Sequence, residues 1–422
     1  MSKSGGGVMV GRHQEISYIV REGQQKDRSL AEELFPLEQI QAARRFHKQL
    51  PDYRMTPLQG LSDLAAMLGI GGIWTKDESY RLSLNSFKVL GGSFALYRYL
   101  QRELGVLGEE TSFAYLASEE VKKKVGDITF ASATDGNHGR GVAWAAQQLG
   151  FKSVIYVHKD TSQRRIDAIA SNGAEVVVID GNYDDAVRQV SADSEKNGWA
   201  VISDTSWDDY TEIPTWIMQG YMTLYSEAQE QFASVGIAKP THVFIQAGVG
   251  ALAASIIGFY HSLFGEEAPV CVIVEPDKAA CIYESALADE EQPQSVKGAL
   301  DTIMAGLACG DPSPLGWQML RQLTDAYLVV PDYIAAKGMR MYANPIGTDP
   351  KVVSGESGAV TLGALAAILH YDQLKDLKEA LKLDEQSHVL CISTEGDTDP
   401  VHYRQVVWDG SSAVPEEYLI NL

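Results

Sequence analysis

Lys88 is the residue whose surroundings most suggest covalent chemistry. It ends the stretch Ser86-Phe-Lys88, opens a helical pattern and has apolar neighbours along the chain. A lysine held in a low-dielectric pocket loses proton affinity, and its amine becomes a nucleophile able to form a Schiff base. A single lysine is more often a solvated surface residue, so the case for Lys88 depends on the motifs that follow it.

A second chemically capable segment covers residues 131–141 and contains Thr-Asp-Gly-Asn-His. It follows the strand-like run 127–130 and opens an amphipathic helical pattern that stops at Gly150. Small residues at the start of a helix let backbone N–H groups point at a ligand, which is a common way of receiving an anion. Taken alone, the segment is equally consistent with an ordinary strand-to-helix turn.

The third segment is glycine-rich and covers residues 246–252. It comes directly after a strand-like run and before a helix, where glycines let the chain approach a phosphate. A single Gly-x-Gly of this kind is a weak signal, because many βα turns share it. A full Gly-x-Gly-x-x-Gly turn followed by an acidic ribose partner is missing, which argues against a nicotinamide-dependent dehydrogenase.

The elements that would position these segments show an alternating pattern. Short β-branched runs alternate with helical patterns from about residue 127 onward, at 154–157, 175–179, 199–202, 242–245, 270–274 and 388–392. This alternation predicts βαβ units and parallel sheets covered by helices on both faces. Ligands in such folds lie at the carboxyl ends of the strands. We also expect an exposed loop over residues 284–300 and a loose tail over residues 1–15.

Bulk properties narrow the class of protein. A chain of 422 residues exceeds what one core usually supports, which predicts two subdomains or a large α/β unit with an insertion. No apolar run of about 18 residues and no signal peptide is found, so we expect a cytoplasmic protein without membrane partners. The net charge of −21 opposes binding to nucleic acid. The four cysteines and nine histidines lack zinc-binding spacings, so no metal site is expected.

Together these segments resemble the fold-type II pyridoxal-phosphate (PLP) enzymes, the superfamily of tryptophan synthase β and threonine dehydratase. That family carries in order a Ser-Phe-Lys stretch, an Asn-His-Gly loop, a glycine-rich phosphate loop and a Ser/Thr turn after the last strand. This chain has them at 86–88, 137–139, 248–252 and 392–397, and the resemblance spans roughly residues 50–400. It implies an α/β fold with two doubly wound open sheets and the cofactor between them. The large domain would be 1–126 and 206–422, and the small domain 127–205.

The resemblance also implies roles for single residues. Lys88 would be the Schiff-base lysine, and Asn137 would hydrogen-bond the 3′-oxygen of the cofactor. The phosphate would be bound by the backbone N–H groups of Gly248, Val249, Gly250, Ala251 and Leu252, and the substrate by Ser132, Thr134, Asp135 and His138. Either Ser393 or Thr394 would lie at the pyridine nitrogen, where a neutral hydroxyl suits β-elimination and β-replacement more than transamination. A homodimer is also implied.

Two carboxylates narrow the choice within the family. Serine and threonine dehydratases usually carry Ser-Ser-Gly-Asn-His where this chain has Thr134-Asp135-Gly-Asn-His. Asp135 is charged at neutral pH, so it can attract a cation or accept the proton of carbon α. Asp204 follows another strand-like run, in Ser-Asp-Thr-Ser-Trp. Two carboxylates beside one PLP suit a substrate with a second amino group.

The four motifs and both carboxylates together resemble the diaminopropionate ammonia-lyase subfamily. That resemblance implies elimination of D- and/or L-2,3-diaminopropionate to pyruvate and two ammonia by way of aminoacrylate, with Lys88, Asp135 and Asp204 as catalytic residues.

Other interpretations stay open at this point. The alternative role for Asp135 is a helix cap, and the alternative role for Asp204 is a turn residue. The second expectation for function is a serine/threonine dehydratase or a cysteine-synthase-like β-replacement enzyme. A third expectation for function is a binding protein that keeps the pocket but has no activity. The presence of Lys88 and both carboxylates argues against it. Whether Cys281 and Cys309 pair is not decided by the sequence.

Overall fold

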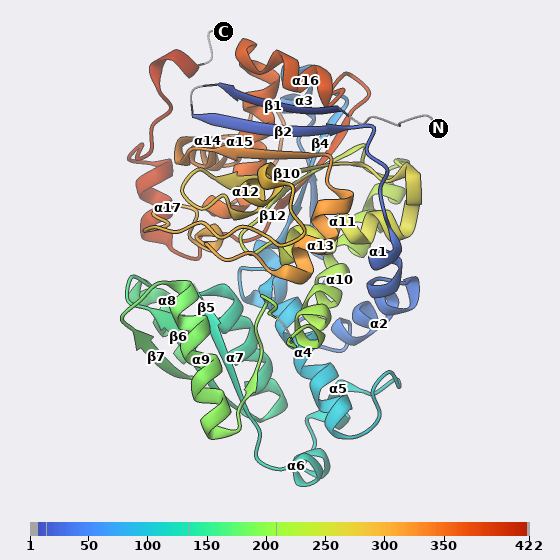
Figure 1. Ribbon diagram of the computed structural model, residues 1–422, viewed down its shortest axis with the longest axis vertical. Helices are drawn as coiled ribbons and strands as arrows, with labels where there is room; N and C mark the ends of the chain where they lie inside the picture. The colour runs from blue at the N-terminus through green and yellow to red at the C-terminus, as the bar shows by residue number, and fades with distance from the viewer. Residues whose placement is uncertain (1–6, 14, 135, 208, 420–422) are drawn as a thin grey trace.

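Two β-sheets wrapped by helices make up the computed structural model, which describes residues 7–13, 15–134, 136–207 and 209–419 (Figure 1). The larger sheet has eight strands in the order β1-β2-β11-β10-β9-β12-β4-β3, and the smaller has four in the order β7-β6-β5-β8. The strands are β1 (Gly7–His13), β2 (Ile16–Glu22), β3 (Leu58–Gly60), β4 (Gly72–Asp77), β5 (Thr129–Thr134), β6 (Lys152–His158), β7 (Glu175–Ile179), β8 (Ala200–Val201), β9 (His242–Gln246), β10 (Val270–Pro276), β11 (Ala326–Val330) and β12 (His388–Ser393).

Helices cover both sheets, as the alternation in the sequence predicted. They are α1 (Ser29–Leu34), α2 (Leu37–His47), α3 (Ser62–Leu68), α4 (Lys88–Glu103), α5 (Phe113–Leu116), α6 (Glu119–Val125), α7 (Asn137–Leu149), α8 (Gln163–Ala170), α9 (Tyr183–Asn197), α10 (Glu212–Ser234), α11 (Ala251–Phe264), α12 (Cys281–Ala288), α13 (Pro314–Leu323), α14 (Asp332–Ala343), α15 (Glu356–His370), α16 (Lys375–Ala380) and α17 (Pro400–Val407). A 3₁₀ helix, η1 (Glu78–Ser83), joins β4 to the loop before α4.

The larger sheet is mixed. Its five central strands β11, β10, β9, β12 and β4 are parallel, whereas β1, β2 and β3 pair antiparallel at the edges. Every residue of β9 and β11 is buried. Parallel strands covered on both faces have this burial pattern because no face meets water. The cofactor motifs predicted at 248–252 and 392–397 follow β9 and β12, so both lie at the carboxyl edge of this sheet.

The smaller sheet is entirely parallel and lies with α7, α8 and α9 in the lower half of Figure 1. Its strands fall between residues 129 and 201, inside the range predicted for the small domain. One apolar cluster nevertheless includes Phe94 of α4, Ile155 of β6 and Tyr221 of α10. Because the core is continuous through α4, the division at residues 126 and 206 stays a prediction.

Close helix packing sets the position of α4 between the two sheets. A Cβ added at Gly91 would lie 2.5 Å from the Tyr221 ring of α10, and one at Gly141 of α7 would lie 2.8 Å from the Cα of Val89. Only glycine permits backbones to approach this closely. The first turn of α4, which begins at Lys88, is therefore held between α7 and α10.

Two expectations about irregular segments were wrong. Residues 7–13 of the expected tail form β1, which pairs with β2 and so extends the larger sheet. The start of the expected loop 284–300 belongs to α12, where Ser285 and Ala286 are buried. Strand β1 is a hairpin partner of the neighbouring β2, whereas α12 packs against β11 and β2, which are distant in the chain. Within the described ranges, no helix is long and apolar enough to cross a membrane.

Candidate active site

Lys88 is the first residue of α4 and borders a cavity between the two sheets. The loop before it holds three non-glycine residues with positive φ, namely Leu82 (46°), Ser83 (58°) and Asn85 (59°). Such conformations persist only where surrounding contacts impose them, and they concentrate at functional sites. Here the contacts come from the turn after β12.

The turn after β12 holds the loop that precedes Lys88 through backbone hydrogen bonds. We call this loop, residues 82–87, the lysine loop. The N–H of Phe87 donates to the carbonyl of Thr394 (3.0 Å), the N–H of Gly396 donates to the carbonyl of Asn85 (3.1 Å), and Ser86 forms an antiparallel bridge with Glu395. The lysine loop and the fourth motif are therefore one structural unit, although about 300 residues separate them.

A buried ion network anchors the other end of the loop. Arg81 in η1 donates to Glu78 (2.8 Å) and to Glu227 of α10 (2.8 Å), and the Nζ of Lys76 lies 2.9 Å from Glu227. The side chains in these ion pairs are 0% exposed. Burial would raise the pKa of Glu227, but Arg81 and Lys76 hold that pKa below its ordinary value. We call Lys76, Glu78, Arg81 and Glu227 the buried ion network.

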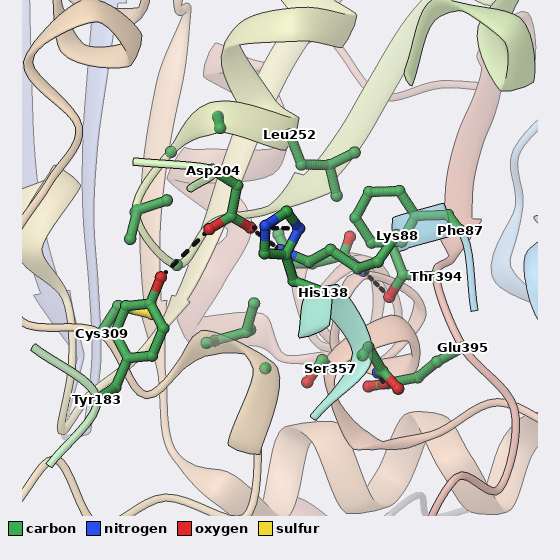
Figure 2. Close-up of a pocket in the computed structure, with 18 residues that line it drawn as sticks. Phe87, Lys88, His138, Tyr183, Asp204, Leu252, Cys309, Ser357, Thr394 and Glu395 are labelled. Carbon is green, nitrogen blue, oxygen red and sulfur yellow. Dashed lines mark hydrogen bonds and ion pairs between the residues drawn. The ribbon is translucent and has the colours of Figure 1, made fainter. Parts of the chain in front are cut away.

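Asp204 is the acidic centre of the cavity, and Figure 2 shows it between Tyr183 and Lys88. It is 3% exposed; its Oδ2 accepts a hydrogen bond from the Nζ of Lys88, and its Oδ1 accepts one from the Tyr183 hydroxyl (3.2 Å). Burial alone would raise the pKa of Asp204, but the ammonium of Lys88, and then His138, hold that pKa well below its usual range. Asp204 is thus a carboxylate whenever Lys88 is charged.

His138 lies on the other side of the same carboxylate. Its Nδ1 is 3.9 Å from the Oδ2 of Asp204, and its Nε2 is 2.9 Å from the carbonyl oxygen of Ile202. A carbonyl oxygen only accepts hydrogen bonds, so Nε2 carries a proton. The imidazole therefore has a fixed orientation, with Nδ1 turned toward Asp204.

The glycine-rich segment forms a cradle of N–H groups at the start of α11. Gly250, the N-cap residue, has a φ of 95°, and no side chain caps the helix. The backbone N–H groups of residues 248–252 border the cavity and donate to no acceptor within the described ranges. A helix N-terminus with open donors is a ready binding site for a phosphate.

The hydroxyls of Thr394 and Ser357 and the side-chain amide of Gln246 also border the cavity. The Nε2 of Gln246 donates to the Oγ1 of Thr394 (2.9 Å), and both residues line the cavity. Ser393 is fully buried, and its hydroxyl lies 3.5 Å from the carbonyl of Glu395 instead. The hydroxyl of Ser357, at the start of α15, is buried and has no hydrogen-bond partner among the described residues.

The structure brings most of the residues predicted for the site together. Those that line one cavity are Lys88, Asn137, His138, Asp204, Gly248, Val249, Gly250, Ala251, Leu252 and Thr394. Asp135 lies outside the described residues. The roles predicted for all of these residues remain predictions, but their convergence from distant segments is a finding.

Three predicted hydroxyls lie outside the lining of the cavity. Ser132 donates to the carbonyl of Ile202 (2.6 Å), and Thr134 accepts from the N–H groups of Gly136 (2.8 Å) and Gly139 (3.0 Å). These hydroxyls and that of Ser393 take part in hydrogen bonds within the fold, so contact with a ligand would require rearrangement. Their assignment to substrate or cofactor stays a prediction.

Sequence reasoning missed other lining residues: Phe87, Tyr183, Gln246, Gly306, Leu307, Cys309, Ser357 and Glu395. Glu395 stands inside the fourth motif, so a carboxylate at that position was a usable signal. Tyr183 and Cys309 stand outside every motif and gave none. Their approach to the cavity depends on how α9 and the segment before α13 pack.

All four cysteines are buried, and none forms a disulfide bond. The Sγ of Cys281 lies 3.5 Å from the carbonyl of Gly248, and the Sγ of Cys309 would lie 3.2 Å from a Cβ at Gly248. Both thiols therefore flank the cradle, and they form no disulfide with each other. No group of three or more His, Cys, Asp or Glu side chains suited to a metal ion is found in the described ranges.

The chain belongs to the family of pyridoxal-phosphate-dependent enzymes, whose family model matches residues 50–395. Within this family, it is 50% identical over 382 residues to the diaminopropionate ammonia-lyase of Escherichia coli strain K12, covering 90% of this chain and 94% of that protein. A solved holo structure of diaminopropionate ammonia lyase from Escherichia coli superposes with a TM-score of 0.88 at 46% identity, covering 96% of this chain and 100% of that one.

A second solved structure of the Escherichia coli enzyme, in complex with an aminoacrylate-PLP azomethine reaction intermediate, has a TM-score of 0.85 at 46% identity. It covers 98% of this chain and 100% of that one. These similarities place the chain in the diaminopropionate ammonia-lyase branch of the family and confirm the fold-type II architecture.

The lining residues fit PLP as the cofactor. Lys88 offers an amine for its aldehyde, and residues 248–252 offer open N–H groups for its phosphate. The buried hydroxyl of Ser357, which has no partner among the described residues, offers a polar ligand in the cavity a further hydrogen bond. The aldehyde and the phosphate of the cofactor therefore each have a matching group in the cavity.

Proposed function

We propose that the chain catalyses the PLP-dependent α,β-elimination of 2,3-diaminopropionate, which with one water gives pyruvate and two molecules of ammonia. The observation that carries this proposal is the contact between Lys88 and Asp204 beside an open phosphate cradle. Elimination requires a base for the proton of carbon α and an acid for the departing β-amine. An amine and a carboxylate in direct contact supply both.

When bound, PLP supplies an electron sink that stabilises negative charge on carbon α. The residues that would hold it are Lys88, Asn137, Thr394 and the N–H groups of 248–252. Lys88 and Asp204 border the same cavity, so both could act on carbon α of a substrate bound there. These assignments are proposals that rest on the side chains and on the family.

Asp204 is suited to change its protonation during the reaction. The charge of Lys88 is the largest influence that keeps the pKa of Asp204 low, whereas burial acts in the opposite direction. When the Lys88 nitrogen loses its positive charge, the strongest influence that lowers the pKa of Asp204 is lost and that pKa rises. Asp204 can then hold a proton close to the departing β-amine, after having attracted the ammonium of the substrate as an anion.

Tyr183 and His138 complete the arrangement around this proton. The Tyr183 hydroxyl donates to Oδ1 of Asp204, and so leaves Oδ2 as the oxygen that exchanges a proton with Lys88. His138 faces the same Oδ2 through Nδ1. A second base for the opposite face of carbon α, assigned to Asp135 from the sequence, stays a hypothesis outside the described residues.

One experiment tests the proposal directly. A visible absorption spectrum of the purified protein is recorded, and D- and then L-2,3-diaminopropionate are added while pyruvate is measured. We expect a Schiff-base band that changes on addition, with pyruvate appearing. A band without pyruvate would keep the cofactor and reject the substrate, and turnover of serine or threonine above that of diaminopropionate would favour a dehydratase. No band after adding PLP would reject the proposal.

The proposal extends to assembly and location. We expect a homodimer, as the family resemblance implies, and light scattering after size-exclusion chromatography measures it. We expect a cytoplasmic protein that binds neither nucleic acid nor membrane, since its net charge of −21 repels both kinds of anionic surface. Recovery of the native protein in the membrane fraction of lysed cells would contradict this.

A further inference from the structure

Glu395 is a buried carboxylate that borders the cavity. No catalytic or binding role was predicted for it from the sequence. It follows β12, is 3% exposed, and accepts a hydrogen bond from the Nδ2 of Asn137 at the start of α7. Figure 2 shows its side chain on the same side of the cavity as Ser357 and Thr394. The contact joins the turn after β12 of the larger sheet to α7, which packs on the smaller sheet. It therefore links the two sheets at the cofactor cavity.

The backbone sets the position of Glu395. Its carbonyl accepts from the N–H of Gly355 (2.9 Å), and it bridges Ser86 in the lysine loop. A Cβ at position 355 would lie 2.9 Å from the Cγ of Glu395. The Glu395 side chain therefore packs directly against the backbone of Gly355. The carboxylate is therefore a fixed group rather than a mobile one.

A fixed carboxylate selects one orientation of the amide beside it. The side-chain amide of asparagine has a donor end and an acceptor end that differ little in shape, so it can be turned by 180° at small steric cost. An ionised carboxylate only accepts hydrogen bonds and repels the amide oxygen. Next to Glu395, the NH₂ group of Asn137 must therefore be the end that faces the carboxylate.

We propose that Glu395 is a positioning residue that fixes the orientation of the Asn137 amide, so that one N–H of its NH₂ group donates to Glu395 and the second N–H serves the 3′-oxygen of the cofactor. This inference rests on the proposed function, because it concerns the same cofactor. The NH₂ group has two hydrogens; one is used by Glu395, and the other remains for an acceptor in the cavity that Asn137 lines.

The inference predicts a specific effect of Glu395→Gln. Glutamine has nearly the same shape but carries both a donor and an acceptor, so it accepts either orientation of Asn137. We expect the dissociation constant for PLP to rise about tenfold, the effect of losing roughly 1.4 kcal/mol from a charge-assisted hydrogen bond. We also expect a shift in the pH at which the visible band of the bound cofactor changes.

The test is a double-mutant cycle read by PLP binding. PLP is titrated into the cofactor-free full chain of the parent, E395Q, N137S and the double variant, with absorbance as the readout. If Glu395 acts through Asn137, E395Q weakens binding in the parent but adds little in the N137S background. The matched control is Glu379→Gln, which removes one exposed carboxylate on α16 and should leave binding unchanged.

The outcomes separate this inference from the proposed function. Equal PLP affinity and an equal spectral pH profile for parent and E395Q would overturn the inference while leaving the function intact, as would additive effects in the cycle. A parent that binds no PLP would instead overturn the proposed function. If E395Q does not reach the folded state by circular dichroism, Glu395→Asp, which withdraws the carboxylate by one methylene, should weaken PLP binding in the same direction, and unchanged affinity there would equally overturn the inference.

Discussion

Two lysine–carboxylate contacts in this protein use the same chemical groups for different purposes. Lys76 and Glu227 belong to the buried ion network, where both side chains are 0% exposed. Lys88 and Asp204 meet at the cavity, where the side chain of the lysine is 20% exposed. The first contact is closed on all sides, and the second faces a space for a ligand.

The difference lies in which charges can be removed. Glu227 is held by Arg81 as well as Lys76, and a guanidinium keeps its charge in proteins. Asp204 has Lys88 as the strongest charge lowering its pKa, and the charge of an amine disappears when the amine reacts. A pair with permanent partners stabilises the fold, whereas a pair with one removable charge can move a proton.

The largest effect is expected when the removable partner is deleted. Lys88→Ala takes away both the nucleophile and the charge that holds Asp204 ionised, so we expect no Schiff-base band and a loss of pyruvate formation on the order of 10⁴-fold or more. The spectrum and a pyruvate assay measure this. Lys297→Ala, which removes an exposed lysine, is the control; a variant of Lys88 that still forms the band would contradict the assignment.

The carboxylate of the cavity should matter for rate and little for folding. Asp204→Asn keeps the shape and removes the proton exchange, so we expect the Schiff-base band to persist while kcat falls by about 10²- to 10⁴-fold. Steady-state kinetics with diaminopropionate measure the fall. Asp409→Asn, at an exposed position, is the matched control, and an unchanged kcat for the Asp204 variant would remove Asp204 from the mechanism.

The buried ion network should show the opposite behaviour. Glu227→Ala leaves Arg81 and Lys76 buried without their shared carboxylate, so we expect the free energy of unfolding to fall by about 3–5 kcal/mol. Urea denaturation measures it. Glu230→Ala breaks an ion pair with Arg44 in which the carboxylate is 60% exposed, and should cost less than about 1 kcal/mol. Equal costs for both variants would show that burial does not distinguish these pairs.

His47, fully buried beside the network, provides a test through pH. Burial lowers its pKa to about 3, and its ring bonds the Thr223 hydroxyl (2.6 Å) and the carbonyl of Leu90 in α4 (3.0 Å). Between about pH 6.5 and 3 the unfolded chain binds a proton that the folded chain does not. The stability present above pH 6.5 is therefore lost as the pH falls, by up to about 1.4 kcal/mol per pH unit.

His47→Gln should remove this contribution to the slope. Urea denaturation of the parent and of the variant at several pH values from 5 to 8 compares the two slopes. We expect the parent to lose stability faster than the variant as the solution becomes acidic. Parallel curves would mean that His47 is protonated in the folded protein or is not buried as described.

The sequence predicted much of the fold wherever the pattern was local. The runs 154–157, 175–179, 242–245, 270–274 and 388–392 all became strands that pair in parallel with their neighbours. Strands β1 to β4 and β11 were not expected. Strand β11 pairs with β2 and β4 pairs with β12, partners that lie far away in the chain, whereas β1 pairs with the neighbouring β2. The four motifs likewise located Lys88, residues 248–252 and Thr394 at the cavity, since order and residue type suffice to identify them.

The amino-acid sequence by itself determined the chemical capabilities of this protein: a nucleophilic amine, a phosphate-binding turn, two carboxylates and the strands that end beside them. Tertiary structure alone decided the contacts between them. Asp204 meets Lys88 across 116 positions of the chain, and Glu395 meets Asn137 across 258. A pKa or a fixed amide orientation depends on burial and on the distance to other charges. Burial and the distances between charges exist only in the folded chain, so they could not be derived from the order of the residues.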